Sequence, residues 1–481
     1  MTTATPPPRP AGEPVADRAW RVETNGIEPI ADDERHGRPS EQFWVWCAAN
    51  IGVFGIVYGV ILVSFGLNVP QALLATVVGT VGSFALVGLV SLAGKRTGVP
   101  TLVVSRAAFG VRGAKLPTLV SYLSLVGWEI VLVALAVLAG QTLLERLGVA
   151  TSTGVTVVLF ALTAGLTIVI GLLGHATILS LHKWLTYAFA AMTLVFIALY
   201  LPEIDWAALG ALPTGSWLEG FAPAASILAA GLGIGWINAA ADYSRYLPRE
   251  ASSRALFGWT TFGASVAPVV LVAFGVLIAG GGTELASSGN PIGDLAAPLP
   301  TWFLVPYLLV AVGGLLAAAV LDIYSSGLNL IALGLRVPRY QSVAVDGVLM
   351  VVGNIYILFV AQDFLGTFQG FLLALGVPLS AWAAIFLVDM ALLRRDGYRV
   401  PDLYRAEGVY GGVNLAAIGA FLVATVVGLG LVTNATFTWL GWWARGPFAA
   451  SSLGLLAAFL VGAALYAVLG PAWAVRRAAA A

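Results

Sequence analysis

The chain has 481 residues, of which 59% are hydrophobic and 10% are charged, and its formal net charge is zero. Soluble domains carry about 25% charged residues, so this composition excludes an ordinary soluble protein and indicates an integral membrane protein. The balanced charge implies no strongly charged partner such as nucleic acid. The single cysteine, Cys47, excludes a disulfide framework within one chain and a cysteine-based zinc site.

The first 40 residues have the proline and charge content of a disordered tail, and we expect no fold in residues 1–40. About twelve apolar runs of membrane-spanning length follow, which predicts an all-α membrane protein rather than a barrel. The predicted spans are residues 43–65, 70–94, 117–144, 153–173, 181–201, 222–243, 256–280, 302–334, 343–361, 365–393, 410–433 and 448–474. The first ten spans form a core within residues 41–400, the last two are additional helices within residues 401–475, and residues 476–481 form a short C-terminus.

Lysine and arginine mark one side of the predicted membrane protein. All but two of the 24 basic residues lie in the tail, beside the loops after even-numbered spans or at the C-terminus, and the exceptions are Arg146 and Arg445. Because basic segments stay in the cytoplasm, both termini are expected there, in a protein of the cytoplasmic membrane. Arg245, at the end of the sixth span, is then expected to be an interfacial anchor.

Glycine interrupts two spans in matching ways. The first span contains Asn50, Gly52, Gly55 and Gly59, and the sixth contains Gly231, Gly233, Gly235 and Asn238. Glycine weakens a helix, and non-helical backbone at membrane depth survives only inside protein or beside a watery cavity, so we predict two broken helices at a binding site. The two spans lie five apart, which makes residues 43–201 and 222–393 two inverted repeats. The alternative is that these glycines only let helices approach closely.

The third span carries Trp128 and Glu129, two side chains suited to different tasks. An indole is a flat surface on which a planar heterocycle can stack, although Trp128 could equally fill the core. Glu129 points about 100° away around the helix, so the two side chains cannot line one pocket equally. It is either a proton-carrying group or a protonated hydrogen-bond partner between helices.

The eighth span carries a polar stripe on one helix face. Its members are Asp322, Ser325, Ser326 and Asn329, at spacing i, i+3, i+4 and i+7. Oxygen ligands in this pattern suit a hard monovalent cation, whereas serines that bond only to their own helix are the alternative. The histidines predict no metal site, because His36, His175 and His182 fall in the tail or in one cytoplasmic loop without a metal-binding helix face.

Several stretches of the chain are distinctive in combination. They are GIEPIADDERHGRP from residue 26, GKRTGVPTLVVSRAAFGVRGAKLP from residue 94, the Gly127 and Trp128 pair, ADYSRYLP from residue 241, DIYSSGLN from residue 322 and GVPLSAWAAIFLVDMALLRRDGY from residue 376. On these stretches the chain resembles the nucleobase-cation symporter family, which includes the cytosine and purine permeases and a hydantoin transporter.

The resemblance implies a leucine-transporter-like fold, with ten core helices as two inverted repeats of five and two helices added. It also implies a heterocycle stacked on Trp128 and on an aromatic residue of the sixth span. The sodium site of the family would correspond here to the carbonyls of Ala49, Gly52 and Asp322 and the hydroxyls of Ser325 and Ser326.

The chain departs from the family around the expected substrate. Gly233 stands where the second aromatic residue is expected, and Trp236 follows three residues later. Leu132 and Val53 replace polar contacts of some relatives, so the hydrogen-bonding edge of the substrate must meet other groups. The candidates are Asn50, Asn238, Asn329 and the backbone of the sixth span.

The sequence therefore predicts a monomeric symporter, not an enzyme, that imports a nucleobase such as cytosine or a purine by alternating access. Sodium is the expected coupling ion, no other cofactor is expected, and a proton carried by Glu129 or Asp322 is the alternative. Two alternatives remain for the function: uptake of another planar heterocycle such as hydantoin, allantoin or uracil, and an uncoupled facilitator.

Overall fold

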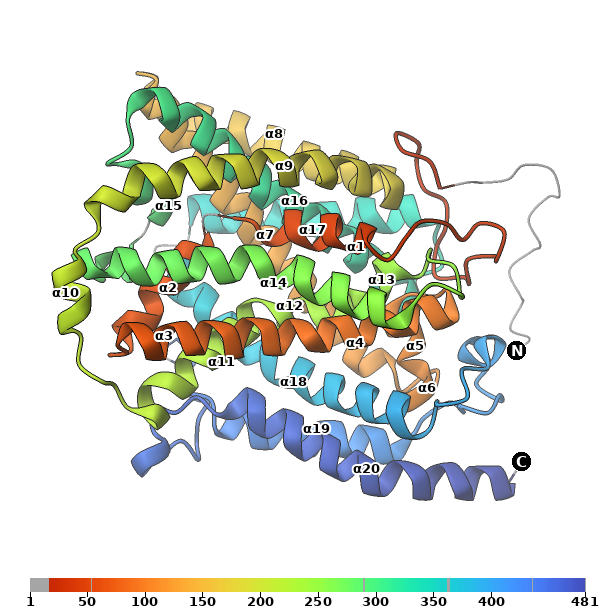
Figure 1. Ribbon diagram of the computed structural model, residues 1–481. Helices are drawn as coiled ribbons and strands as arrows, with labels where there is room; N and C mark the ends of the chain where they lie inside the picture. The colour runs from red at the N-terminus through yellow and green to blue at the C-terminus, as the bar shows by residue number, and fades with distance from the viewer. Residues whose placement is uncertain (1–16, 53, 289, 361–363, 435, 481) are drawn as a thin grey trace.

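The computed structural model describes residues 17–480 except 53, 289, 361–363 and 435, and all regular structure in these residues is helical (Figure 1). The α-helices are α1 (Glu41–Asn50), α2 (Phe54–Ser64), α3 (Val69–Thr76), α4 (Gly82–Thr97), α5 (Thr101–Val104), α6 (Arg106–Phe109), α7 (Lys115–Arg146), α8 (Thr153–Leu173), α9 (His175–Tyr200), α10 (Trp206–Ala211), α11 (Ala222–Gly231), α12 (Gly233–Trp236), α13 (Ala240–Ser244), α14 (Ser253–Ile278), α15 (Pro291–Ala296), α16 (Thr301–Leu333), α17 (Arg339–Phe359), α18 (Phe364–Leu392), α19 (Leu415–Gly430) and α20 (Gly454–Ala480). The π-helical turns are η1 (Val77–Val81) and η3 (Trp217–Phe221), and the 3-10 turns are η2 (Leu201–Glu203), η4 (Ile237–Ala239), η5 (Ala279–Gly281), η6 (Glu284–Ser287), η7 (Val400–Tyr404) and η8 (Gly446–Phe448).

The long helices account for the predicted membrane spans. Within the described residues, 10 helices are long and apolar enough to cross a membrane. The helices α1 and α2 together form a further, broken span with a bend of 59°. The remaining predicted span is α19, an apolar helix of 16 residues. The prediction of about twelve spans is thus confirmed, and the chain is a multi-pass membrane protein.

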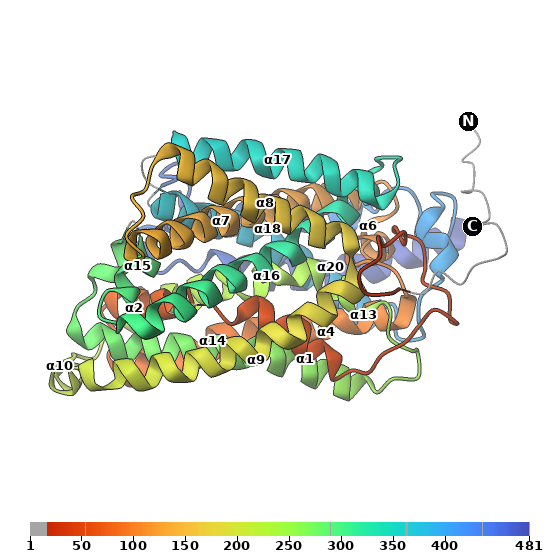
Figure 2. The same cartoon turned by 90° about the horizontal axis from the view of Figure 1, so that it is seen from above.

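The helices run roughly side by side along one axis (Figures 1 and 2). In the middle α7 packs along α16, and the first span packs against α14. At one edge α19 and α20 pack against each other and against α18, and the start of α20 also reaches α11 of the sixth span. The two helices beyond the predicted ten-helix core are therefore peripheral.

A close approach of two glycines holds α2 against α14. A Cβ atom on Gly59 would lie 2.1 Å from the carbonyl oxygen of Val272, and one on Gly275 would lie 2.0 Å from the carbonyl oxygen of Ile56. No side chain fits at either position, so the backbones touch directly. For Gly59 the structure supports the packing alternative rather than a break in the helix.

Residues 17–40 cross one end of the bundle, where they appear in dark red in Figure 1. The amide of Ile30 donates to the carbonyl of Gly98 at 3.0 Å, and the amide of His36 donates to the carbonyl of Tyr246 at 2.7 Å. The expectation of disorder over residues 1–40 is therefore wrong for residues 17–40, whereas residues 1–16 lie outside the described residues. Composition averages over the segment and does not reveal that some of its polar groups find partners at helix ends.

Glu23 is the centre of this contact, with a side chain that is 2% exposed. Its Oε1 accepts hydrogen bonds from Arg245 Nη2 at 3.2 Å, from the Tyr324 hydroxyl at 3.1 Å and from the Tyr246 hydroxyl. Its Oε2 accepts from the amide of His175 at 2.7 Å and lies 4.0 Å from Nη1 of Arg339. One carboxylate thus connects the starts of α9 and α17, the end of the sixth span and α16.

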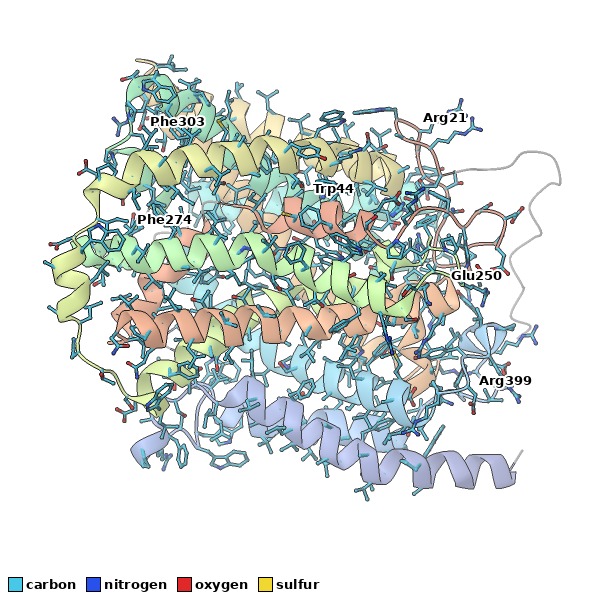
Figure 3. All side chains as sticks on the ribbon, in the orientation of Figure 1. Arg21, Trp44, Glu250, Phe274, Phe303 and Arg399 are labelled. Atoms are coloured by element: carbon cyan, nitrogen blue, oxygen red, sulfur yellow. The ribbon has the colours of Figure 1, made fainter. Side chains whose placement is uncertain are left out.

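Arg245 is fully buried, so its expected role as an interfacial anchor is wrong. The guanidinium also donates to the carbonyl of Gly26 at 2.6 Å. A buried charge needs a paired and hydrogen-bonded partner, and residues 17–40 supply it. We call this end of the bundle, with residues 17–40, Arg245 and Arg339, the basic end. Figure 3 shows Arg21, Glu250 and Arg399 at this end and Phe274 and Phe303 at the opposite one.

Replacing Glu23 by glutamine should destabilise the basic end, because Arg245 and Arg339 would lose their carboxylate while staying buried. Breaking such a pair costs about 3 kcal/mol or more. We expect a lower melting temperature in detergent and faster hydrogen exchange over residues 17–40. Glu28→Gln is the matched control, since Glu28 is an exposed acid of the same segment. Equal effects of the two substitutions would contradict a central role for Glu23.

Candidate functional site

Both glycine-rich spans are interrupted, as the sequence predicts. The first span changes direction between Asn50 and Phe54, and Val53, inside this break, lies outside the described residues. The sixth span stops being helical at Leu232, where φ is −115° and ψ is −100°, and it continues as the short segments α12, η4 and α13. Such interruptions free peptide groups from the helical ladder, which is how discontinuous membrane helices build binding sites.

A cavity lies between the two interruptions. Its wall is formed by Ala49, Asn50, Gly52, Gly55, Tyr58, Trp128, Leu132, Gly231, Leu232, Trp236, Pro268, Gly314, Leu315 and Ala318. Most of these side chains are apolar, and a few polar groups, such as the Asn50 amide and the two indoles, stand among them. An apolar pocket with a few polar groups is the usual form of a small-molecule site.

Two tryptophans face this cavity from different helices. Trp128 on α7 is half-buried, and its Nε1 would lie 3.2 Å from a Cβ atom on Gly235, so the indole rests on the glycine backbone of the sixth span. Trp236 on α12 is 8% exposed, and Trp46 packs edge-on against it with ring centroids 5.8 Å apart. The absence of a side chain at Gly235 therefore decides where Trp128 can lie.

Asn50 is the polar side chain of the first-span break in the cavity wall. Its Nδ2 donates to the carbonyl of Trp46 at 2.8 Å. The amide nitrogen is thus used inside the helix, and the Oδ1 atom of the same side chain is the group suited to accept a hydrogen bond from a ligand.

Three of the predicted substrate residues lie elsewhere. Gly233 faces α4, because its amide donates to Ser83 Oγ at 3.2 Å and a Cβ atom on it would meet the carbonyl carbon of Ser83 at 2.3 Å. Asn238 and Asn329 are buried and each donates from Nδ2 to Ser121 Oγ at 2.7 Å. These asparagines connect the sixth span and α16 to α7, which is a structural contact outside the cavity wall.

The polar stripe of α16 is buried, but its hydroxyl groups point to other helices. Ser325 Oγ lies 3.1 Å from the hydroxyl of Tyr243, which donates to the carbonyl of Leu321 at 2.7 Å. Ser326 Oγ lies 2.6 Å from Glu129 Oε1 and is also hydrogen-bonded to Asp346 Oδ2. Ala49 and Gly52 lie on the cavity wall instead. In this conformation the two serine hydroxyls of the expected sodium site are thus bonded to other helices, while Ala49 and Gly52 line the cavity.

Ser326 belongs to a cluster of buried carboxyl groups that the sequence analysis only partly recognised. Asp346 on α17 is fully buried, and its Oδ1 accepts from the hydroxyl of Tyr122 at 3.0 Å. Glu129 is fully buried too. Asp322 is 1% exposed, and neither of its carboxyl oxygens has a hydrogen-bond partner among the described residues. An aspartate inside the ninth predicted span was the available signal for Asp346, because ionisable residues are rare within membranes.

Glu129 and Asp346 meet at Ser326, and Asp322 lies one helical turn before Ser326 on α16, so we call these four residues the carboxyl cluster. Carboxylates in a low-dielectric interior repel one another, which favours bound protons or a cation at such a cluster. Glu129 and Tyr122 occur seven residues apart on α7, which places them on one helix face. Trp128 and Ser121 are also seven residues apart and lie on the adjacent face of α7. Neighbouring faces of α7 therefore contribute Trp128 to the cavity wall and Glu129 to the carboxyl cluster.

Comparisons with known proteins agree over most of the chain. A family model described as permease for cytosine/purines, uracil, thiamine, allantoin matches residues 29–462. YxlA of Bacillus subtilis (strain 168), named as a candidate purine-cytosine permease, is 29% identical over 470 residues, or 93% of this chain and 95% of YxlA. The purine-cytosine permease FCY2 of Saccharomyces cerevisiae is 25% identical over 279 residues, or 56% of this chain and 49% of FCY2.

The fold has close counterparts among solved structures. Mhp1, a nucleobase-cation-symport-1 family transporter, in a closed conformation with bromovinylhydantoin bound, superposes with a TM-score of 0.72 at 20% identity. The match covers 94% of this chain and 98% of that chain. The prediction of an all-α, leucine-transporter-like fold is thereby confirmed.

Replacing Gly233 by alanine should destabilise the protein by about 1–3 kcal/mol, because the added methyl group would collide with the backbone of α4. The measurement is the melting temperature in detergent. Gly258→Ala is the control, since a Cβ atom on Gly258 meets nothing within 4 Å in the helix α14. An unchanged melting temperature with a changed ligand affinity would instead place Gly233 in the binding site.

Proposed function

Because the chain belongs to the family of permeases for cytosine/purines, uracil, thiamine and allantoin, and is a membrane transport protein rather than an enzyme, we propose that it is a cation symporter for a nucleobase such as cytosine or a purine. The observation that carries this proposal is the apolar cavity at the two helix interruptions, with Trp128 and Trp236 in its wall. A planar base would stack on an indole, which contributes about 1–3 kcal/mol per base in other proteins.

Hydrogen-bonding groups around the cavity would select the heterocycle. The Oδ1 atom of Asn50 would accept from a ring N–H or an exocyclic amine, and peptide groups freed at Leu232 would meet the remaining edge. Leu132 adds apolar surface four residues beyond Trp128. Hydantoin, allantoin and uracil are alternative substrates, because each is also a small planar ring with donors and acceptors.

The coupling cation would bind beside the cavity. Ala49 and Gly52 offer carbonyl oxygens at the first-span break, Asp322 offers a carbonyl, and Ser325 and Ser326 offer hydroxyls. The carboxyl cluster adds carboxyl oxygens next to Ser326. A cation that favours one arrangement of the first span and α16 would couple its own binding to that of the substrate. Sodium is the proposed ion, and a proton on Glu129 or Asp322 is the alternative.

The proposed transporter is a monomer in the cytoplasmic membrane, with both termini in the cytoplasm. The distribution of lysine and arginine supports this orientation. The basic end would then be the cytoplasmic end. Alternating access would require the contacts of Glu23 at this end to open when substrate is released inward.

Replacing Trp128 by alanine should abolish concentrative uptake or raise its KM about tenfold or more, because the stacking surface is lost. Uptake of radiolabelled cytosine, adenine, hypoxanthine, uracil and allantoin would be measured in proteoliposomes under a sodium gradient, a proton gradient or neither. Trp302→Ala is the control, since this indole is 66% exposed. Full uptake by the Trp128 variant would show that Trp128 does not bind the substrate. Equilibration of the substrate without accumulation by the wild type would favour an uncoupled facilitator.

Replacing Ser326 by alanine should raise the sodium concentration for half-maximal uptake about tenfold, because one hydrogen-bonding oxygen of the cation site disappears. The control is Ser64→Ala, a serine whose Oγ donates to its own helix at Ile61. If the sodium dependence of uptake is unchanged in both variants, the result would favour coupling to a proton on Glu129 or Asp322.

A further inference from the structure

Three side chains with metal-binding atoms meet at the basic end, outside the cavity. They are Asp17 and His36 from the N-terminal segment and His175 from the first residue of α9, and their ligand atoms all lie within 4.8 Å of one another. Asp17 Oδ2 lies 2.7 Å from His175 Nδ1 and 3.9 Å from His36 Nε2. The histidines, which show no common helix face in the sequence, are thus brought together by the path of residues 17–40.

The ring of His36 is oriented as a metal ligand would be. Its Nδ1 lies 2.8 Å from the carbonyl oxygen of Glu34, so this nitrogen carries the proton and donates it there. The lone pair is then on Nε2, the atom that faces Asp17. Histidines that bind metals almost always donate their second ring nitrogen to a carbonyl or carboxylate in this way.

The other two side chains are held in place by the protein. The ring of His175 stacks on Tyr246, with centroids 4.3 Å apart and an angle of 19° between the planes. Asp17 accepts from the amide of Ala176 through Oδ1, which leaves Oδ2 toward the histidines. The 2.7 Å contact between His175 Nδ1 and Asp17 Oδ2 is a hydrogen bond, so a metal ion would take the place of the proton that these two atoms share.

We propose that Asp17, His36 and His175 form a binding site for a divalent transition metal of the zinc class, which ties residues 17–36 to the start of α9. Zinc takes nitrogen and carboxylate ligands at about 2.0–2.1 Å, and a tetrahedral arrangement then separates the ligand atoms by about 3.3 Å. The two distances from Asp17 Oδ2, 2.7 and 3.9 Å, lie on either side of this value, and all three ligand atoms lie within 4.8 Å of one another, so side-chain shifts of about 1 Å would bring them into a tetrahedral arrangement.

The exposure of the three groups fits an exchangeable site. The side chains of Asp17 and His175 are 2% and 6% exposed, whereas that of His36 is 46% exposed and opens the cluster to solvent. Three protein ligands also leave one tetrahedral position for water, unlike the closed sites of structural zinc. The metal would therefore bind and leave according to its concentration.

Metal binding would stabilise the closed arrangement of the basic end. Residues 17 and 36 flank Glu23, whose carboxylate holds Arg245 and also accepts from the amide of His175. A metal that joins both sides of this contact would oppose its opening. The effect on transport rests on the proposed function, whereas metal binding itself does not.

The binding test uses the full chain in detergent, purified through a tag without histidine, and titrated with Zn²⁺ alone in a calorimeter. We expect one Zn²⁺ per chain, and affinity at least tenfold weaker for His36→Ala and for Asp17→Asn. Asp32→Asn is the matched control, because Asp32 is an exposed acid of the same segment, paired with Arg249. No stoichiometric binding, or equal affinity of all four proteins, would overturn the proposal.

Two further measurements separate the parts of the proposal. Zn²⁺ should raise the melting temperature of the wild type and of the Asp32 variant but not that of the His36 variant. In proteoliposomes Zn²⁺ on the side of the basic end should slow uptake by the wild type and spare the His36 variant. Zinc binding without any solute uptake would support the metal site and contradict the proposed function. Uptake at the same rate with and without bound zinc would contradict the proposal that the metal holds the basic end closed.

Discussion

A peptide group without a partner costs several kilocalories per mole at membrane depth, and this constraint organises the whole bundle. The chain leaves the helical path at Leu232 and again after Asn50, and both places are enclosed by other helices. Ser83 of α4 satisfies the amide of Gly233, and the carbonyl of Ile51 faces Gly314 of α16, where a Cβ atom would lie 3.1 Å from the oxygen. The cavity is the space that remains between these enclosed interruptions.

The buried polar groups form two networks that share helices. Tyr324 and Ser326 lie two residues apart on α16, yet the first contacts Glu23 at the basic end and the second belongs to the carboxyl cluster. On α17, Arg339 and Asp346 are divided between the same two networks. A shift of α16 or α17 relative to the sixth span would therefore change both networks at once. Through these shared helices, cation binding at the carboxyl cluster could be coupled to closure of the basic end.

The accuracy of the sequence interpretation depended on whether a feature was local. Long apolar runs predicted the spans, and clustered glycines predicted both interruptions, because hydropathy and backbone freedom act within a few residues. Trp236 lies beside the cavity because it directly follows the glycines of the sixth span, whereas Trp128 on α7 was assigned to the site from its indole ring and the family resemblance. Arg245, Asp346 and residues 17–40 were misread or missed, because their environment depends on other helices and loops that lie far from them in the sequence.

The sequence by itself determined that this is a helical membrane protein with two broken spans, because apolar length and glycine content limit what the backbone can do in a bilayer. Only the tertiary structure decided which polar groups meet. It turned Ser326 toward Glu129 and Asp346, buried Arg245 against Glu23, and brought Asp17, His36 and His175 together. The physical reason is that a polar side chain can satisfy its hydrogen bonds with any neighbour within reach, and packing of distant helices alone selects that neighbour.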